Sequence, residues 1–135
     1  MGERENKRLR FRDVNTLGRV VKFEKLEVWQ RSYALTVDVY KLFRQNRDFG
    51  LKDQITRSAL SVPSNIAEGW ERHTEKEKFR FLSIAKGSAG ELKTQLMIAV
   101  DIGYINKDIG ALKIKEIDEI ALMLGGLMKS LNIEK

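Results

Sequence analysis

Apolar side chains recur at steps of three and four residues along the chain from Phe23 onward, and only one proline, Pro63, interrupts them. This spacing puts apolar residues on one face of an α-helix, whereas a half-buried strand needs strict alternation. A β-sandwich also needs many turn residues, and one proline and ten glycines are too few for that. We therefore expect an all-α protein, and 135 residues suffice for one domain with its own core.

The pattern divides into four helical segments with short connections between them. The expected ranges are 23–45, 51–71, 74–103 and 106–131. Thr74 and Glu77 fit a capping box, in which the threonine caps the third helix and the glutamate reaches back. Asn106 is a favoured cap for the fourth helix. Long helices joined by short connections predict an antiparallel, up-down-up-down four-helix bundle over residues 23–135.

Helix-breaking residues inside these segments need a structural reason. Pro63 removes a backbone hydrogen bond, so we expect either a kink just before it or a helix that restarts with Pro63 in its first turn. Gly87 and Gly90 in the third segment each cost about 1 kcal/mol of helix propensity relative to alanine. We expect close approach between helices to offset that cost there and at Gly125–Gly126.

The third segment is apolar over more than half of its circumference. One side carries Leu82, Ala85, Ala89, Leu92, Leu96, Ala99 and Val100, and the adjacent side carries Phe81, Ile84, Ser88, Glu91, Gln95, Ile98 and Ile102. A single bundle cannot cover both sides. We therefore expect the second side to pack against another copy of the chain, as a homo-oligomer.

Positive charge is concentrated at the start of the chain. Residues 1–22 hold seven bases and three acids, which is +4 of the total +6. We interpret them as a weakly ordered basic extension before the folded body. Such an arm can lie along nucleic-acid phosphates, but it can equally be a solubilising tail or an over-long translation start.

Two further groups of bases lie on the predicted bundle. Lys41, Arg44, Arg47 and Lys52 surround the first connection; Lys76, Lys86 and Lys93 form a solvent-facing stripe on the third helix, with Arg72 and Arg80 near its start. Such residues often form only a solvated face. In an oligomer, however, repeated weak basic patches neutralise many phosphates at once, which favours binding of RNA or DNA without sequence preference.

The sequence lacks the residues of most catalytic and metal sites. It has no cysteine and one histidine, His73, so thiolate sites and His-rich zinc sites are excluded, and we expect no metal, cofactor or catalytic residue. A polar motif remains on the second and third helices: Ser61, Asn65, Glu68 and Glu91. We interpret it as structural, with Glu68 or Glu91 accepting from Arg57, Arg72 or a hydroxyl to fix the register of the bundle or a subunit contact.

Nothing in the sequence indicates a membrane protein or an exported one. The longest uncharged apolar run, 120–128, is far shorter than the roughly 20 residues of a membrane-spanning helix. No apolar stretch of signal-peptide length follows the basic N-terminus, so the cytoplasm is the expected location.

Three motifs resemble those of the proteins encoded in intervening sequences of bacterial large-subunit ribosomal RNA genes. They are Phe23-x-x-Leu26-x-x-Trp29, the run SVPSNIAEG at 61–69 and the run AKGSAGEL at 85–92. The resemblance covers about 23–131. It implies a four-helix protomer, a ring-like homopentamer with a basic surface, and nucleic-acid binding, with no catalytic residues. The fold is also similar to that of the accessory protein of diversity-generating retroelements.

The sequence therefore predicts a non-enzymatic, oligomeric nucleic-acid-binding protein. The alternative is an oligomeric scaffold or accessory subunit that binds another protein. Trp70 discriminates between them, because an exposed tryptophan suits a partner contact whereas a buried one is simple packing. We expect Trp70 to be buried.

Overall fold

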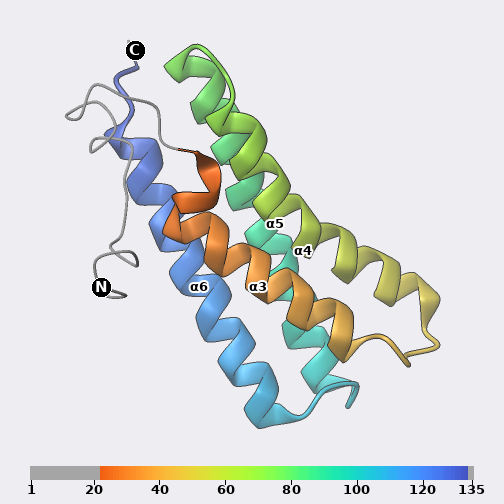
Figure 1. The fold of residues 1–135 in the computed structure, drawn as a ribbon. Coiled ribbons are helices and arrows are strands. Elements are labelled where there is room, and N and C mark those ends of the chain that lie inside the picture. The colour runs from red at the N-terminus through yellow and green to blue at the C-terminus, as the bar shows by residue number, and fades with distance from the viewer. Residues whose placement is uncertain (1–21, 134–135) are drawn as a thin grey trace, which may run out of the picture.

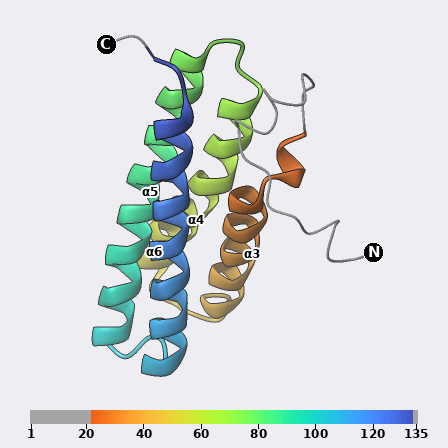
Figure 2. The same ribbon diagram turned by 90° about the vertical axis from the view of Figure 1, so that its left-hand side faces the viewer.

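The fold is a bundle of four long antiparallel helices in a computed structural model that describes residues 22–133 (Figure 1). A 3-10 turn, η1 (Phe23–Lys25), precedes α3 (Glu27–Leu42), α4 (Phe49–Trp70), α5 (Glu75–Asp101) and α6 (Lys107–Ser130). Each helix packs on the next along the chain, and α3 also packs on α6 (Figure 2). The all-α, up-down-up-down prediction is confirmed. The predicted weakly ordered extension, apart from Lys22, lies outside the described residues.

The first helix starts later and ends earlier than predicted. Leu26 is buried with an extended backbone (φ −74°, ψ 127°), so it separates η1 from α3 where one continuous helix was expected. After the connection, α4 starts two residues earlier than predicted. The Asp48 carboxylate caps it by accepting a hydrogen bond from the backbone N–H of Leu51 at 3.1 Å. An aspartate at this position satisfies one of the free N–H groups of the first turn.

Caps at the other two helix starts follow the sequence pattern. The Thr74 hydroxyl accepts from the backbone N–H of Glu77 at 3.1 Å, as the capping box predicts. The Glu77 carboxylate, however, lies 3.5 Å from that hydroxyl and does not complete the box through the backbone. The Asn106 side chain accepts from the N–H groups of Asp108 and Ile109 and caps α6. These caps fix the ends of the α4–α5 and α5–α6 connections.

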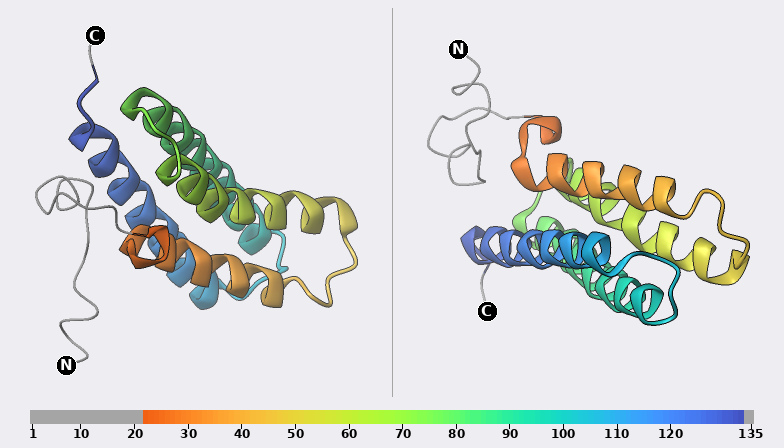
Figure 3. Two further views of the ribbon diagram at one scale, coloured as in Figure 1. Left: turned by 45° about the horizontal axis from the view of Figure 1, so that its top comes forward. Right: turned by 90° about the horizontal axis from the view of Figure 1, so that it is seen from below.

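Pro63 lies inside a continuous helix. α4 runs unbroken from Phe49 to Trp70, so the predicted restart at Pro63 is wrong. The axis of α4 bends along its length, as both views in Figure 3 show. A bend is what the missing N–H and the ring of an internal proline produce.

The core runs along the centre of the bundle and takes side chains from all four helices. Its largest fully buried members are Phe43, Leu26, Ile55, Ile66, Leu82, Leu92, Leu96, Ile117, Ile120 and Leu124. Trp70 is only 6% exposed, so the prediction that it packs in the core is confirmed. The Lys78 ammonium donates to the Trp70 carbonyl at 2.9 Å and closes the end of α4. Loss of water around Lys78 lowers the pKa of its ammonium.

Some apolar side chains at helical spacing are exposed. On α3, Val28, Leu35 and Val39 are buried, whereas Tyr33 and Tyr40 lie at the surface. Ile109 and Leu112, at the start of α6, are also exposed. On α5, all of the first side except the partly exposed Val100 is buried in the bundle, and the second side leaves Ile84, Ile98 and Ile102 exposed but buries Ser88 against α4.

The close helix contacts lie at other glycines than those predicted. A Cβ atom at Gly87, Gly90 or Gly126 would meet nothing within 4 Å in the described chain, so these glycines do not bring helices of one protomer together. Gly69 and Gly110, by contrast, do lie at close contacts between helices. A Cβ at Gly69 would lie 2.9 Å from Phe81 Cβ, and one at Gly110 would overlap the Val100 side chain.

Candidate nucleic-acid interface

Three exposed bases meet where α3 leads into α4. Lys41, Arg44 and Arg47 are exposed and have no ion pair to any other residue of 22–133. Lys52, the fourth predicted member, differs: it is half-buried, its ammonium donates to the Arg44 carbonyl at 3.0 Å, and it lies over the Phe49 ring. We call the first three the end group. Lys52 instead holds the connection through its hydrogen bond to Arg44.

A hydrogen bond between two connections fixes the chain next to the end group. The Tyr104 hydroxyl, from the α5–α6 connection, donates to the Asp48 carboxylate at 2.9 Å. The pKa of Asp48 is lowered from its ordinary value of 3.8, first by the backbone N–H of Leu51 and then by Tyr104. The same bond raises the pKa of the Tyr104 phenol. Asp48 therefore stays ionised next to Arg47, but its carboxylate accepts from Leu51 and Tyr104 and forms no ion pair with Arg44 or Arg47 among the described residues.

Replacement of Tyr104 by phenylalanine should raise the pKa of Asp48 part of the way towards 3.8, because the Leu51 N–H remains. A lowered carboxyl pKa stabilises the fold above pH 3.8, and this stabilisation is lost as the pH falls through the folded-state value. An NMR titration of the Asp48 carboxyl measures the change. Tyr33→Phe is the control, since Tyr33 stacks on Trp29 instead; an unchanged Asp48 pKa in Tyr104→Phe contradicts the account.

In the second predicted basic group, on and before α5, only some side chains are exposed and without an ion pair among the described residues. Lys76 and Arg80 are exposed. Arg72 is half-buried, paired with Glu68 at 3.3 Å, and its guanidinium lies 4.6 Å from the centre of the Phe81 ring.

Of the three lysines predicted for the α5 stripe, Lys93 differs from its prediction. Lys93 is half-buried and pairs with Asp118 of α6 at 2.9 Å, so it does not face solvent freely. Lys86 is exposed, but its Cε lies 3.9 Å from where a Cβ at Gly125 of α6 would stand. Both face the α6 side of the bundle, because the polar sector of α5 borders that helix.

The predicted polar motif joins α4 to α5. Ser61 and Ser88 share a hydrogen bond of 2.7 Å between their hydroxyls, and the Asn65 amide donates to Ser61 at 2.9 Å. Glu68 pairs with Arg72, one of the two arginines proposed for it, while Arg57 pairs with Asp53 instead. Glu91 is exposed beside Ser61 and Ser88 in a groove of about 300 Å³. Ser58, which the sequence did not single out, bonds Gln95 of the second side of α5 across the same contact.

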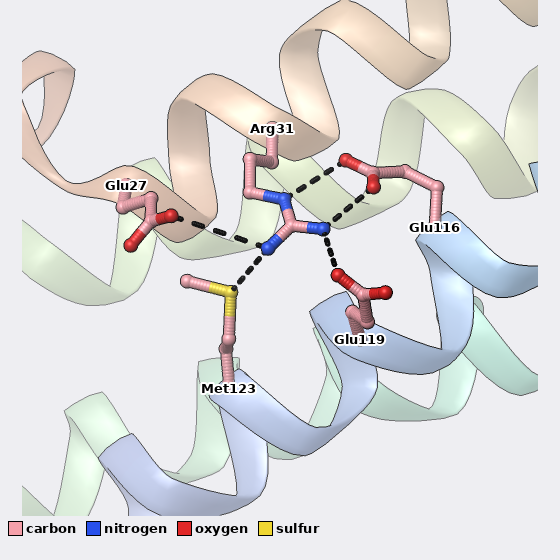
Figure 4. Close-up of polar contacts among 5 residues, drawn as sticks. All are labelled: Glu27, Arg31, Glu116, Glu119 and Met123. Carbon is pink, nitrogen blue, oxygen red and sulfur yellow. Dashed lines mark hydrogen bonds and ion pairs between the residues drawn. The ribbon is translucent and has the colours of Figure 1, made fainter.

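Sequence reasoning missed an ion cluster between α3 and α6 (Figure 4). The Arg31 guanidinium donates to Glu116 at 2.6 and 2.9 Å and to Glu119 at 2.6 Å. Glu27 lies 4.0 Å away on the same helix, and the Met123 sulfur accepts at 3.6 Å. The bonds to Glu116 and then Glu119 raise the pKa of Arg31 above its ordinary value. The spacing of Glu27 and Arg31 hinted at one pair, but partners 85 and 88 residues away leave no local signal.

Residues 22–133 form neither a metal-binding cluster nor a membrane-spanning helix. Among residues 22–133, no group of three histidine, cysteine or acidic side chains is placed to hold a metal ion. Within the same range, no helix has the length and apolarity needed to cross a bilayer.

Residues 24–126 match the family model described as 23S rRNA-intervening sequence protein. A crystal structure of a protein of unknown function from the S23 ribosomal protein family of Bacteroides thetaiotaomicron is similar in fold. It has a TM-score of 0.72 and 24% sequence identity, and the match covers 76% of this chain and 99% of that one. No curated protein matches the sequence.

Proposed function

Because this chain belongs to the 23S rRNA-intervening sequence protein family, whose fold it shares, we propose that it binds RNA or DNA through phosphate contacts, without catalysis and without sequence preference. One observation carries the proposal: the end group, Lys41, Arg44 and Arg47, is exposed and free of ion pairs within the described chain. Lysine and arginine side chains in this state release condensed counterions when they bind phosphates, which favours association.

The position of the end group favours it over the α5 stripe as the phosphate-binding site. All three bases lie within seven consecutive residues, at the end of α3 and in the connection after it, and Asp48, which follows Arg47 in sequence, accepts from Leu51 and Tyr104. On α4 and α5, by contrast, Arg72 and Lys93 would first have to leave Glu68 and Asp118. The end group can therefore contact phosphates without breaking an existing ion pair.

Self-association is the second part of the proposal, with a homopentamer as the expected form. The second side of α5 leaves Ile84, Ile98 and Ile102 exposed; Ile102 alone keeps 52% of its surface in water. Covering such a row in another copy removes apolar surface from water at roughly 25 cal/mol per Å². A light-scattering mass of 15.6 kDa at micromolar concentration, the mass of one chain, would refute it.

The variant Lys41→Gln, Arg44→Gln, Arg47→Gln should weaken binding to duplex and single-stranded nucleic acid alike. If each base meets one phosphate of a duplex, the slope of log K against log salt should become shallower by about 2.7 per bound protomer. Fluorescence anisotropy between about 50 and 200 mM salt measures both effects.

The matched control is Lys76→Gln, Arg80→Gln, Lys86→Gln, which removes the same charge from exposed positions at or near α5. We expect this second variant to keep most of the affinity and most of the salt slope. A larger loss in the control than in the end-group variant would move the site to α5. No binding by the wild-type protein at about 50 mM salt refutes nucleic-acid binding altogether.

A further inference from the structure

A groove of about 320 Å³ lies between α3 and α4 and runs towards the end group. Two tyrosines of α3 line it, with Tyr33 54% exposed and Tyr40 46% exposed, and Leu60 of α4 forms part of the opposite wall. Exposed aromatic rings cost free energy in water unless something covers them. Nothing in the described chain covers these two.

The tyrosines are arranged as separate platforms on one helix face. Seven residues separate Tyr33 from Tyr40, which is two turns and about 10 Å along the axis. The Tyr33 ring packs on Trp29 at 5.0 Å between ring centres, and Trp29 packs on Phe23 at 5.4 Å. This row of rings holds the Tyr33 ring from one side. A partner that stacks on Tyr33 therefore loses little conformational entropy of the side chain on binding.

Charge at one end of the groove selects the occupant. Lys41 and Arg44 line the same groove as Tyr40, and none of the described residues that line it is acidic. The occupant must therefore offer flat apolar groups to the tyrosines and negative charge to the bases. A single strand of nucleic acid offers both, whereas a duplex hides the faces of its bases.

We propose that this groove binds the unpaired bases of single-stranded RNA or DNA, with Tyr33 and Tyr40 stacking on bases while Lys41 and Arg44 contact phosphates. The inference rests on the proposed function and deepens it, because it names the strand state of the ligand. It predicts that the protein binds a single strand more tightly than a duplex of the same sequence and length. Base–aromatic stacking is tolerant of sequence, in agreement with binding that lacks sequence preference.

The test compares Tyr33→Ala, Tyr40→Ala with Tyr33→Phe, Tyr40→Phe by fluorescence anisotropy on a labelled 15-nucleotide single strand and on its duplex. The alanine variant should lose about fivefold or more in single-strand affinity for each ring removed, and little for the duplex. The phenylalanine variant keeps both rings and should bind like the wild type. Leu122→Ala, another exposed apolar truncation, on α6, should change neither affinity.

The outcomes separate this inference from the proposed function. If the end-group variant weakens binding but the alanine variant does not, phosphate binding stands and the groove proposal is overturned. If the alanine variant instead lowers the molecular mass by light scattering, the groove is a contact between copies of the chain, and the proposal is again overturned. If the wild-type protein binds neither strand form, both proposals fail together.

Discussion

Replacement of Gly69 by alanine should destabilise the protein by about 3 kcal/mol, near the upper end of what an overpacked helix contact costs. The added Cβ would lie 2.9 Å from Phe81 Cβ and 3.4 Å from the Lys78 carbonyl oxygen. No side-chain rotation moves either atom, because one is attached directly to the α5 backbone and the other belongs to it. α4 must therefore move away from α5. Thermal or denaturant unfolding measures the loss.

Gly87→Ala provides the contrast on α5. Its Cβ would meet nothing within 4 Å, so alanine should raise stability through helix propensity, by up to about 1 kcal/mol. If Gly87→Ala lost as much stability as Gly69→Ala, the space around Gly87 would not be open within the protomer, and this explanation would be wrong. If that loss came with a lower molecular mass, the open face around Gly87 would be a contact between copies of the chain.

The fold could be predicted from the sequence because each helix carries a long, regular apolar period. Boundaries were less predictable, because they depend on single residues whose role is set by the fold. Leu26 breaks the first helix by entering the core, and Asp48 starts α4 early by capping it. Leu26 does not differ by type from positions where a helix continues, and Asp48 is one of the polar residues in 46–48 that could have capped α4. On α3 the period fits two adjacent rows, and only the positions of α4 and α6 decide that Tyr33 and Tyr40 stay outside.

The motifs that carried the resemblance turn out to describe a packing surface. Ser61 of the SVPSNIAEG run bonds Ser88 of the AKGSAGEL run, and a Cβ at Gly69 of the first run would lie 2.9 Å from Phe81 Cβ of α5. This explains why the sequence identified the family readily and its function poorly: these short runs specify how two helices meet. The polar motif was correctly interpreted as structural at Ser61 and Asn65.

The candidate site was predicted in part, for a reason of geometry. Lys41, Arg44 and Arg47 lie at or just after the end of α3, and no described residue forms an ion pair with them, so their predicted exposure agrees with the structure. Lys93 lies mid-helix, and a helical wheel shows which sector of α5 is polar but not that α6 brings Asp118 to it. The same lack of long-range information hid Arg31 and its partners. Nucleic-acid binding itself stays a prediction.

Replacement of Arg31 by methionine should cost about 2 kcal/mol, the second large effect that we expect. The change keeps a long apolar stem but leaves Glu116 and Glu119 beside each other without the guanidinium that bonds both. Removing one partner of a fully buried pair costs about 3–5 kcal/mol. The Arg31 side chain is 23% exposed and its two partners are more exposed, so solvent screening reduces that figure.

The matched control is Lys113→Met, which breaks a 2.8 Å pair with Asp38 between the same two helices. Asp38 is nearly half exposed, so the control should lose less than about 1 kcal/mol. Adding Glu116→Gln and Glu119→Gln to Arg31→Met should recover part of the stability, because the amides remove the repulsion between the two acids. If the triple variant is no more stable than Arg31→Met, the loss comes from packing of the arginine stem against α6, and the charge account of this contact is wrong.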